Sequence, residues 1–138
     1  MAGGWYVLLE RELPGVEPAT ESGRALLYYQ RHVDELAEQL ELPLLSGFFC
    51  PERAELLAYL RDQGVTPDDH ALPEEDWFDA AAGLATVRGL LDRLREEPGD
   101  MPQAAKIIAD LAELERVLVP AERHGVSFHL ARKLPTAG

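Results

Sequence analysis

The sequence contains a single cysteine, Cys50, among its 138 residues. One cysteine cannot form an intramolecular disulfide, so packing must hold the fold together and a reducing compartment is expected. Basic residues are also scarce, since 13 Lys and Arg face 25 Asp and Glu, for a formal net charge of −12. A surface of this sign repels the phosphates of nucleic acids and anionic lipid headgroups, so neither is an expected partner.

Long hydrophobic runs and phosphate-binding glycine motifs are missing too. No stretch approaches the roughly 18 to 20 apolar residues of a membrane span. The chain opens on Met-Ala-Gly-Gly without the basic leader and long apolar stretch of a secretory signal, so we expect a cytoplasmic protein. Neither G-x-G-x-x-G nor the P-loop pattern occurs, and no cofactor is predicted.

Aromatic residues make up only 7% of the chain, so the hydrophobic core must depend on aliphatic residues such as leucine and alanine, which recur at helical spacing. Apolar residues recur three and four apart in four segments bounded by proline or glycine, which predicts helices at about 22–40, 51–64, 79–97 and 100–125. Ser22, Asp79 and Asp100 are the expected N-caps of the first, third and fourth helices. Pro120 should kink the last turn of the fourth helix or separate it from the rest.

The two ends of the chain have the composition of strands. Trp5 to Glu10 is rich in aromatic and branched residues, and Val126 to Ala131 alternates in period two, which is typical of a half-buried strand. We expect the two segments to pair, in a direction that the sequence does not fix. The prediction is an α+β, mainly α single domain over 1–138, with about four helices packed on this small sheet and a flexible loop at about 65–76.

An acidic cluster without Lys or Arg lies in that loop and continues to the third helix. It comprises Asp68, Asp69, Glu74, Glu75, Asp76 and Asp79. The spacing does not match a calcium-binding loop, so a solvated loop is favoured over a metal site, and no metal is predicted. Trp77 and Phe78 follow Asp76, and two interpretations are open. They could anchor a protein interface whose rim is charged, or they could form a hydrophobic staple that packs on the first turns of the helix.

Cys50 precedes Pro51 at an expected helix N-terminus, where a thiol can become nucleophilic. Phe48 and Phe49 beside it favour a buried structural cysteine instead. The four histidines, at positions 32, 70, 124 and 129, lack metal-ligand spacing. His124 fits a helix C-terminus, whereas His129 lies on the polar side of the last strand and could face water or a pocket.

Two phrases of the C-terminal half resemble recurrent sequences in an uncharacterised family of small bacterial helix-rich proteins. They are Asp76-Trp77-Phe78-Asp79 with Gly83-Leu84-Ala85-Thr86-Val87-Arg88, and Gly125-Val126-Ser127-Phe128-His129-Leu130. The resemblance implies a bacterial housekeeping or accessory domain and transfers no catalytic residue.

The acidity and the missing catalytic motifs predict a non-catalytic interaction or regulatory module that binds a basic protein. Its expected contact residues are Asp68, Asp69, Glu74, Glu75, Asp76 and Trp77. The alternative is a small enzyme or ligand-binding domain, with a pocket between sheet and helices formed by His129, Tyr28, Tyr29 and Cys50. A homo-oligomer formed through an apolar helix face is a third alternative.

Overall fold

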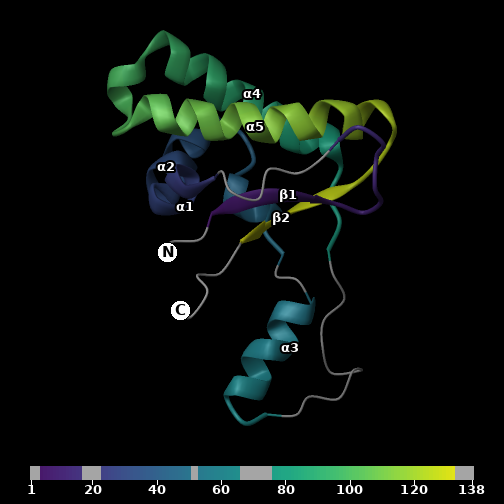
Figure 1. Cartoon of the computed structure of the whole chain (residues 1–138). Helices are drawn as coiled ribbons and strands as arrows, with labels where there is room; N and C mark the ends of the chain where they lie inside the picture. Colours follow the sequence, from purple (N-terminus) through teal and green to yellow (C-terminus); the bar gives the residue numbers. More distant parts are fainter. Residues whose placement is uncertain (1–3, 17–22, 51–52, 66–75, 133–138) are drawn as a thin grey trace.

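The computed structural model describes residues 4–16, 23–50, 53–65 and 76–132. The fold is α+β and mainly α, as predicted (Figure 1). Its elements in chain order are β1 (Trp5–Leu9), α1 (Arg24–Tyr28), α2 (Gln30–Gln39), the 3-10 turn η1 (Leu45–Phe48), α3 (Arg53–Asp62), α4 (Ala80–Glu96), the 3-10 turn η3 (Pro98–Asp100), α5 (Ala104–Arg123) and β2 (Phe128–Arg132). None of the described helices has the length and apolar character to cross a membrane.

The two terminal strands pair as expected, and their direction is antiparallel. Trp5 lies opposite Arg132 and Leu9 lies opposite Phe128. Asp110 of α5 ties the chain after β1 to the helices, because its Oδ2 accepts hydrogen bonds from the backbone N–H groups of Ala25 and Leu26 at 2.9 and 3.3 Å. A carboxylate from another helix therefore occupies the N-terminus of α1, where it satisfies two free donors.

The second edge of β2 is also paired, by two single residues from distant parts of the chain. Phe49 forms a parallel bridge with Leu130, and Phe78 forms an antiparallel bridge with Phe128. The Phe78 N–H donates to the Phe128 carbonyl at 2.7 Å, and the reciprocal bond measures 2.9 Å. β2 is thus the central strand, with β1 on one side and these two bridges on the other.

Helices α4 and α5 lie side by side and cover one face of the sheet (Figure 1). The core between the elements is rich in leucine, as the low aromatic content predicts. Its fully buried members include Leu26, Leu45, Leu84, Leu90, Leu91, Leu94, Ile107, Leu111, Leu118, Phe128 and Leu130. Burial of these side chains is the main source of stability, at about 1.5–3 kcal/mol for each.

The first predicted helix is divided into α1 and α2 at Tyr29, whose φ of −103° and ψ of 24° leave the helical region. The division lets the two halves take different partners, since α1 packs on α5 and β1 while α2 packs on α4 and η1. Its expected N-cap, Ser22, lies outside the described residues, and Gly23 occupies the N-cap position of α1.

The fourth helix does not begin at Asp100, contrary to the prediction. Met101 precedes Pro102 and is extended, with φ −136° and ψ 129°, as the proline ring requires of the residue before it. Asp100 therefore ends η3, and Gln103 precedes the first turn of α5. At the other end α5 continues through Pro120 to Arg123 as one helix, which excludes the separate last turn, one of the two predicted alternatives.

Two glycines of α4 allow close packing, as their position on an amphipathic helix suggests. A Cβ on Gly83 would overlap the ring of Phe128, which is 1% exposed and lies against Phe48 and Phe78. A Cβ on Gly89 would meet only the terminal methyl of Leu42, a half-buried and flexible side chain.

We expect opposite results from alanine at these two sites. Gly83→Ala should lower the free energy of unfolding by about 1–2 kcal/mol, because overpacking the fixed ring outweighs the gain in helix propensity. Gly89→Ala should leave stability unchanged or raise it by up to about 1 kcal/mol. Urea unfolding followed by circular dichroism measures both, and equal effects of the two variants would contradict the packing.

Candidate functional site

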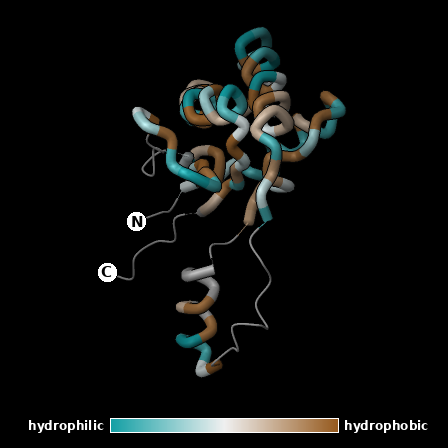
Figure 2. The backbone as a smooth tube through the Cα atoms, turned by 90° about the vertical axis from the view of Figure 1, so that its right-hand side faces the viewer, coloured by the Kyte–Doolittle hydropathy of each residue, from teal (hydrophilic) through white to brown (hydrophobic). Residues whose placement is uncertain are grey.

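Cys50 and Asp76 lie on either side of α3 in the sequence, and we call the described residues 4–16, 23–50 and 76–132 the main body. Both points lie against β2, since the Cys50 N–H donates to the Leu130 carbonyl at 3.0 Å and Phe78 pairs with Phe128. We call residues 51–75 the arm; its described part is 53–65 and contains α3. In two perpendicular views α3 stands apart from the other helices (Figures 1 and 2).

Three side chains, of Cys50, Trp77 and His129, and the backbone of Asp76 meet at the base of the arm, and we call these four residues the clamp. His129 Nδ1 lies 3.0 Å from the Asp76 carbonyl oxygen. A carbonyl only accepts, so Nδ1 carries the hydrogen and donates it. The Asp76 N–H in turn donates to Cys50 Sγ at 3.3 Å. The backbone of one residue is therefore held from both sides, by residues 26 and 53 positions away.

Trp77 stacks on the His129 ring, with centroids 4.4 Å apart and planes inclined by 24°. His129 is fully buried although it lies on the side of β2 that the period-two pattern marks as polar. The other ring nitrogen, Nε2, is buried and has no hydrogen-bond partner among the described residues. The pattern could not reveal this burial, since the ring that covers His129 arrives from a segment 52 residues earlier.

The described contacts of the clamp join distant parts of the chain to one another. Cys50 is 7% exposed and its sulfur already accepts a hydrogen bond, as expected of a buried structural cysteine. Within the described part of the chain, no group of three His, Cys, Asp or Glu side chains is placed to hold a metal ion. The arrangement instead fixes where the arm begins and ends.

Tyr28 and Tyr29, the other predicted pocket residues, lie at the junction of α1 and α2. Tyr28 is 81% exposed, and its ring lies edge-on to that of Tyr29 with centroids 4.8 Å apart. The Tyr29 ring in turn lies edge-on to that of His32, with centroids 5.8 Å apart. The ring contacts found in the described residues join His129 to Trp77 and not to this pair. The four predicted pocket residues therefore do not form one cluster.

Of the predicted partner-binding residues, Asp76 and Trp77 belong to the clamp, and Asp68, Asp69, Glu74 and Glu75 lie outside the described residues. Asp79 caps α4 as predicted, since its Oδ1 accepts from the Ala81 N–H at 3.1 Å. Both rings are half-buried, but Phe78 packs on Phe48 of the core, with ring centroids 5.5 Å apart, whereas Trp77 stacks on His129. The two adjacent aromatic residues thus divide between core and clamp. His124 ends α5 as its C-cap.

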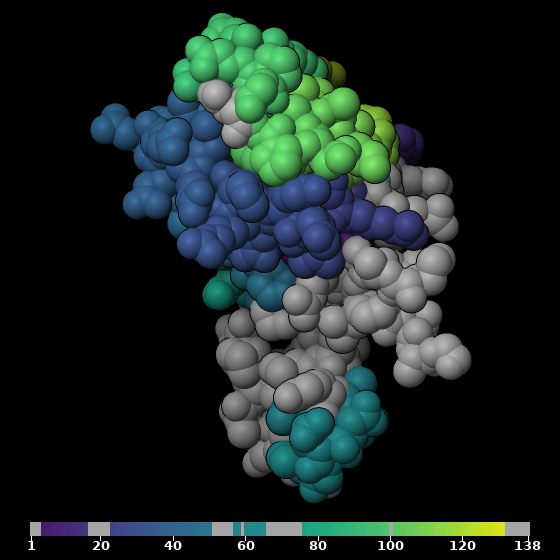
Figure 3. Space-filling model, turned by 90° about the vertical axis from the view of Figure 1, so that its left-hand side faces the viewer, coloured from purple at the N-terminus to yellow at the C-terminus, as the bar shows by residue number. Residues whose placement is uncertain are grey.

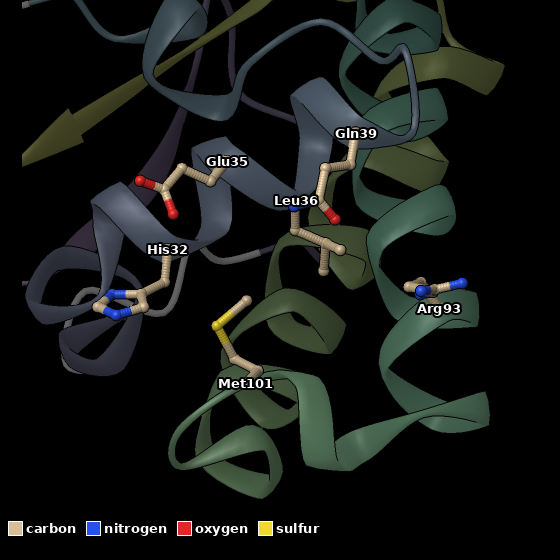
Figure 4. Close-up of a pocket in the computed structure, with 6 residues that line it drawn as sticks. All are labelled: His32, Glu35, Leu36, Gln39, Arg93 and Met101. Carbon is tan, nitrogen blue, oxygen red and sulfur yellow. The ribbon is translucent and has the colours of Figure 1, made fainter.

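Described residues line two pockets on the main body that sequence reasoning did not identify. The larger, of about 320 Å³, lies between α2 and α4 and is lined by His32, Glu35, Leu36, Gln39, Arg93 and Met101 (Figure 4). Arg93 also pairs with Glu97 at 3.1 Å. The smaller, of about 210 Å³, lies between β1 and the α2–η1 region and is lined by Trp5, Gln30, Ser46 and Phe49.

The smaller pocket has the location predicted for a ligand site, between sheet and helices, but none of the four predicted residues lines it. The larger pocket is lined by acidic, basic and amide side chains. Its lining contains one histidine and neither cysteine nor serine. Neither lining contains a nucleophile paired with a base, so the geometry favours no reaction.

No protein-family model, curated protein or solved structure matches this chain.

Proposed function

We propose that this chain is a non-catalytic interaction module that binds a basic protein partner through its acidic surface. It would act in the cytoplasm as a bacterial accessory domain of the kind that the resemblance implies. The observation that carries the proposal is the uneven distribution of charge. The arm has seven carboxylates and two arginines in 25 residues, a net charge of −5 out of −12 for the whole chain.

The rest of the chain adds to this acidity and carries the remaining −7 of the net charge. Among the described residues, ion pairs join Arg31 with Glu35, Arg88 with Glu115, Arg93 with Glu97, and Arg116 with Glu113, at 3.1 to 3.4 Å. Such exposed pairs contribute little stability. Each pair neutralises one carboxylate along with one cation, and further carboxylates such as Glu38, Glu41 and Asp92 lie at the exposed surface.

Complementary charge accelerates association and selects partners, and salt screens it. We therefore expect the immobilised chain to retain a basic protein from a bacterial lysate at low ionic strength, and to release it as salt approaches about 1 M, where the Debye length falls to about 3 Å. Mass spectrometry of the eluates identifies the retained proteins, and their sequences give their isoelectric points.

An acidic protein of matched size and net charge, coupled to the same resin, is the control for simple ion exchange. Proteins retained on both resins do not count as partners. Retention that is independent of salt, or a retained set without excess positive charge, would overturn the proposal.

A further inference from the structure

The larger pocket of the main body lies where α2 meets α4 and the turn η3. In the space-filling view the blue surface of α1 and α2 borders the green surface of α4, η3 and α5 (Figure 3). Residues three, four and seven positions apart share one face of a helix, and such a set forms the α2 wall: His32, Glu35, Leu36 and Gln39. Arg93 of α4 and Met101, which follows η3, form the other wall. The volume of about 320 Å³ is at the small end of the range for small-molecule sites.

The charged side chains of this pocket lie at opposite ends (Figure 4). Glu35 lies on the same side as His32. Arg93 lies on the other side, toward Gln39. Because Glu35 and Gln39 are four residues apart on α2, the two ends are separated by about 6 Å along the helix axis. The pocket therefore has an acidic end and a basic end.

Between the two ends the lining is apolar. Leu36 and Met101 lie between the charged side chains and are only 5% and 6% exposed (Figure 4). Leu36 belongs to the buried face of α2, and the extended backbone of Met101 is required by Pro102 after it. Neither side chain donates a hydrogen bond. The middle of the pocket therefore suits an apolar group.

Each charged group is positioned by a partner four residues away on its own helix. Arg31 pairs with Glu35 at 3.3 Å, and Glu97 pairs with Arg93 at 3.1 Å. A carboxylate accepts up to about four hydrogen bonds and a guanidinium has five N–H donors, so each group can hold a ligand beside its present partner.

The balance of charge decides which ligand fits. Glu35 and Arg93 cancel, as do their partners Arg31 and Glu97, so the site is neutral with His32 counted as uncharged, although the whole chain has a net charge of −12. A simple anion or a simple cation would engage one end of the pocket only. A molecule that carries both charges would engage both ends.

We infer that this pocket binds a small dipolar molecule whose ammonium and carboxylate groups are separated by an apolar segment, as in an ω-amino acid. The carboxylate meets Arg93 and Gln39, the ammonium group meets Glu35, and the apolar segment lies on Leu36 and Met101. Arginine suits the first contact because its planar fork matches a carboxylate. The inference goes beyond the proposed function and does not depend on the basic partner.

The test titrates ε-aminocaproate into the full chain and follows the backbone amides by proton–nitrogen correlation NMR. We expect saturable shifts on α2, on α4 and around Met101, with a Kd on the order of 1 mM for so small a ligand. Glycine should bind at least about tenfold more weakly, because its two charges are too close together to reach both ends. The absence of saturable shifts at the pocket up to about 20 mM would overturn the inference.

A dipeptide serves as the second probe because its charges are also well separated, but a polar amide lies between them. Dialanine should therefore bind more weakly than ε-aminocaproate, since the apolar middle of the pocket cannot replace the water that solvates the amide. Tighter binding of dialanine would identify a short peptide as the ligand and overturn the apolar segment.

Two neutral variants and two analogues of the probe test the ends separately. Arg93→Gln should weaken the binding of ε-aminocaproate about tenfold and leave that of its amide, which lacks the carboxylate, unchanged. Glu35→Gln should also weaken ε-aminocaproate binding about tenfold and leave that of hexanoate, which lacks the ammonium group, unchanged. A variant that weakens the probe and its analogue equally would act on the shape of the pocket, which would overturn the assigned contacts.

Arg88→Gln and Glu38→Gln are the matched controls, since both residues are exposed on the same two helices and neither lines the pocket. Both controls should bind ε-aminocaproate like the unchanged chain, and circular dichroism checks the helix content of all four variants. Equal weakening by the controls would mean that the charge of the whole surface attracts the probe, which would overturn the pocket as its site. A chain that binds the probe but retains no basic protein would lose the proposed function and keep this inference.

Discussion

Replacing Gly23 with alanine should lower the free energy of unfolding by about 3 kcal/mol, the largest effect that we expect from adding one methyl group. Gly23 has φ 87° and ψ 8°, in the left-handed region. Its Cβ would overlap the backbone of Trp5 rather than a movable side chain. Its carbonyl also accepts from the Trp5 N–H at 3.2 Å and from the Leu27 N–H at 3.1 Å, so β1 and α1 meet at this residue.

Gly15→Ala separates backbone strain from the steric overlap. Gly15 has a similar φ of 79°, but no atom lies within 4 Å of a Cβ built there. We expect this variant to lose only about 1 kcal/mol, the usual cost of a left-handed conformation for a residue with a side chain. Urea denaturation of both variants gives the comparison. If the two lose the same free energy, β1 does not approach α1 as closely as described.

The second large effect should come from the clamp. His129→Ala removes a fully buried ring, its stacking on Trp77 and the donor to the Asp76 carbonyl. We expect a loss of about 3 kcal/mol from the cavity and the unsatisfied carbonyl together. His129→Asn keeps an amide donor near the position of Nδ1 but loses the ring, and His129→Leu keeps volume but loses the donor, so each should lose less than alanine does.

A local measurement tells clamp opening from general destabilisation. Cys50 is the only cysteine of the chain and is 7% exposed, so thiol labelling under native conditions reports directly on the base of the arm. We expect His129→Ala to accelerate labelling more than Leu94→Ala, a core variant on α4 of comparable destabilisation. Equal acceleration at matched stability would mean that His129 acts on the whole fold and not on the clamp.

Local patterns predicted the elements whose boundaries are set by neighbouring residues. Asp79 caps α4 through an amide two residues away, and Gly125, with φ 66°, follows the end of α5. Where the sequence misled, a more distant partner or a stronger local constraint was responsible. α1 and α2 separate at Tyr29 because they pack on different helices, and Pro102 forces Met101 to be extended, which detaches Asp100 from α5.

The clamp was beyond prediction for the same reason. Cys50, Trp77 and His129 were each singled out, but separately, because their contacts span 26 and 53 positions and depend on the second edge of β2. A period-two pattern reports that one face of a strand is apolar and says nothing about what covers the other. The pockets were missed because they lie between α2 and elements far along the chain.

The central place of β2 also has a consequence for synthesis on the ribosome. Translation proceeds from the N-terminus, so β2 emerges after every other described element, yet β1, Phe49 and Phe78 all take their backbone partners from it. The α4–α5 hairpin can form as soon as it leaves the exit tunnel. The Trp5–Leu9 segment, by contrast, remains without its strand partner until Phe128–Arg132 has been synthesised. A chaperone that shields apolar segments during elongation would therefore have a long-lived target in the Trp5–Leu9 segment.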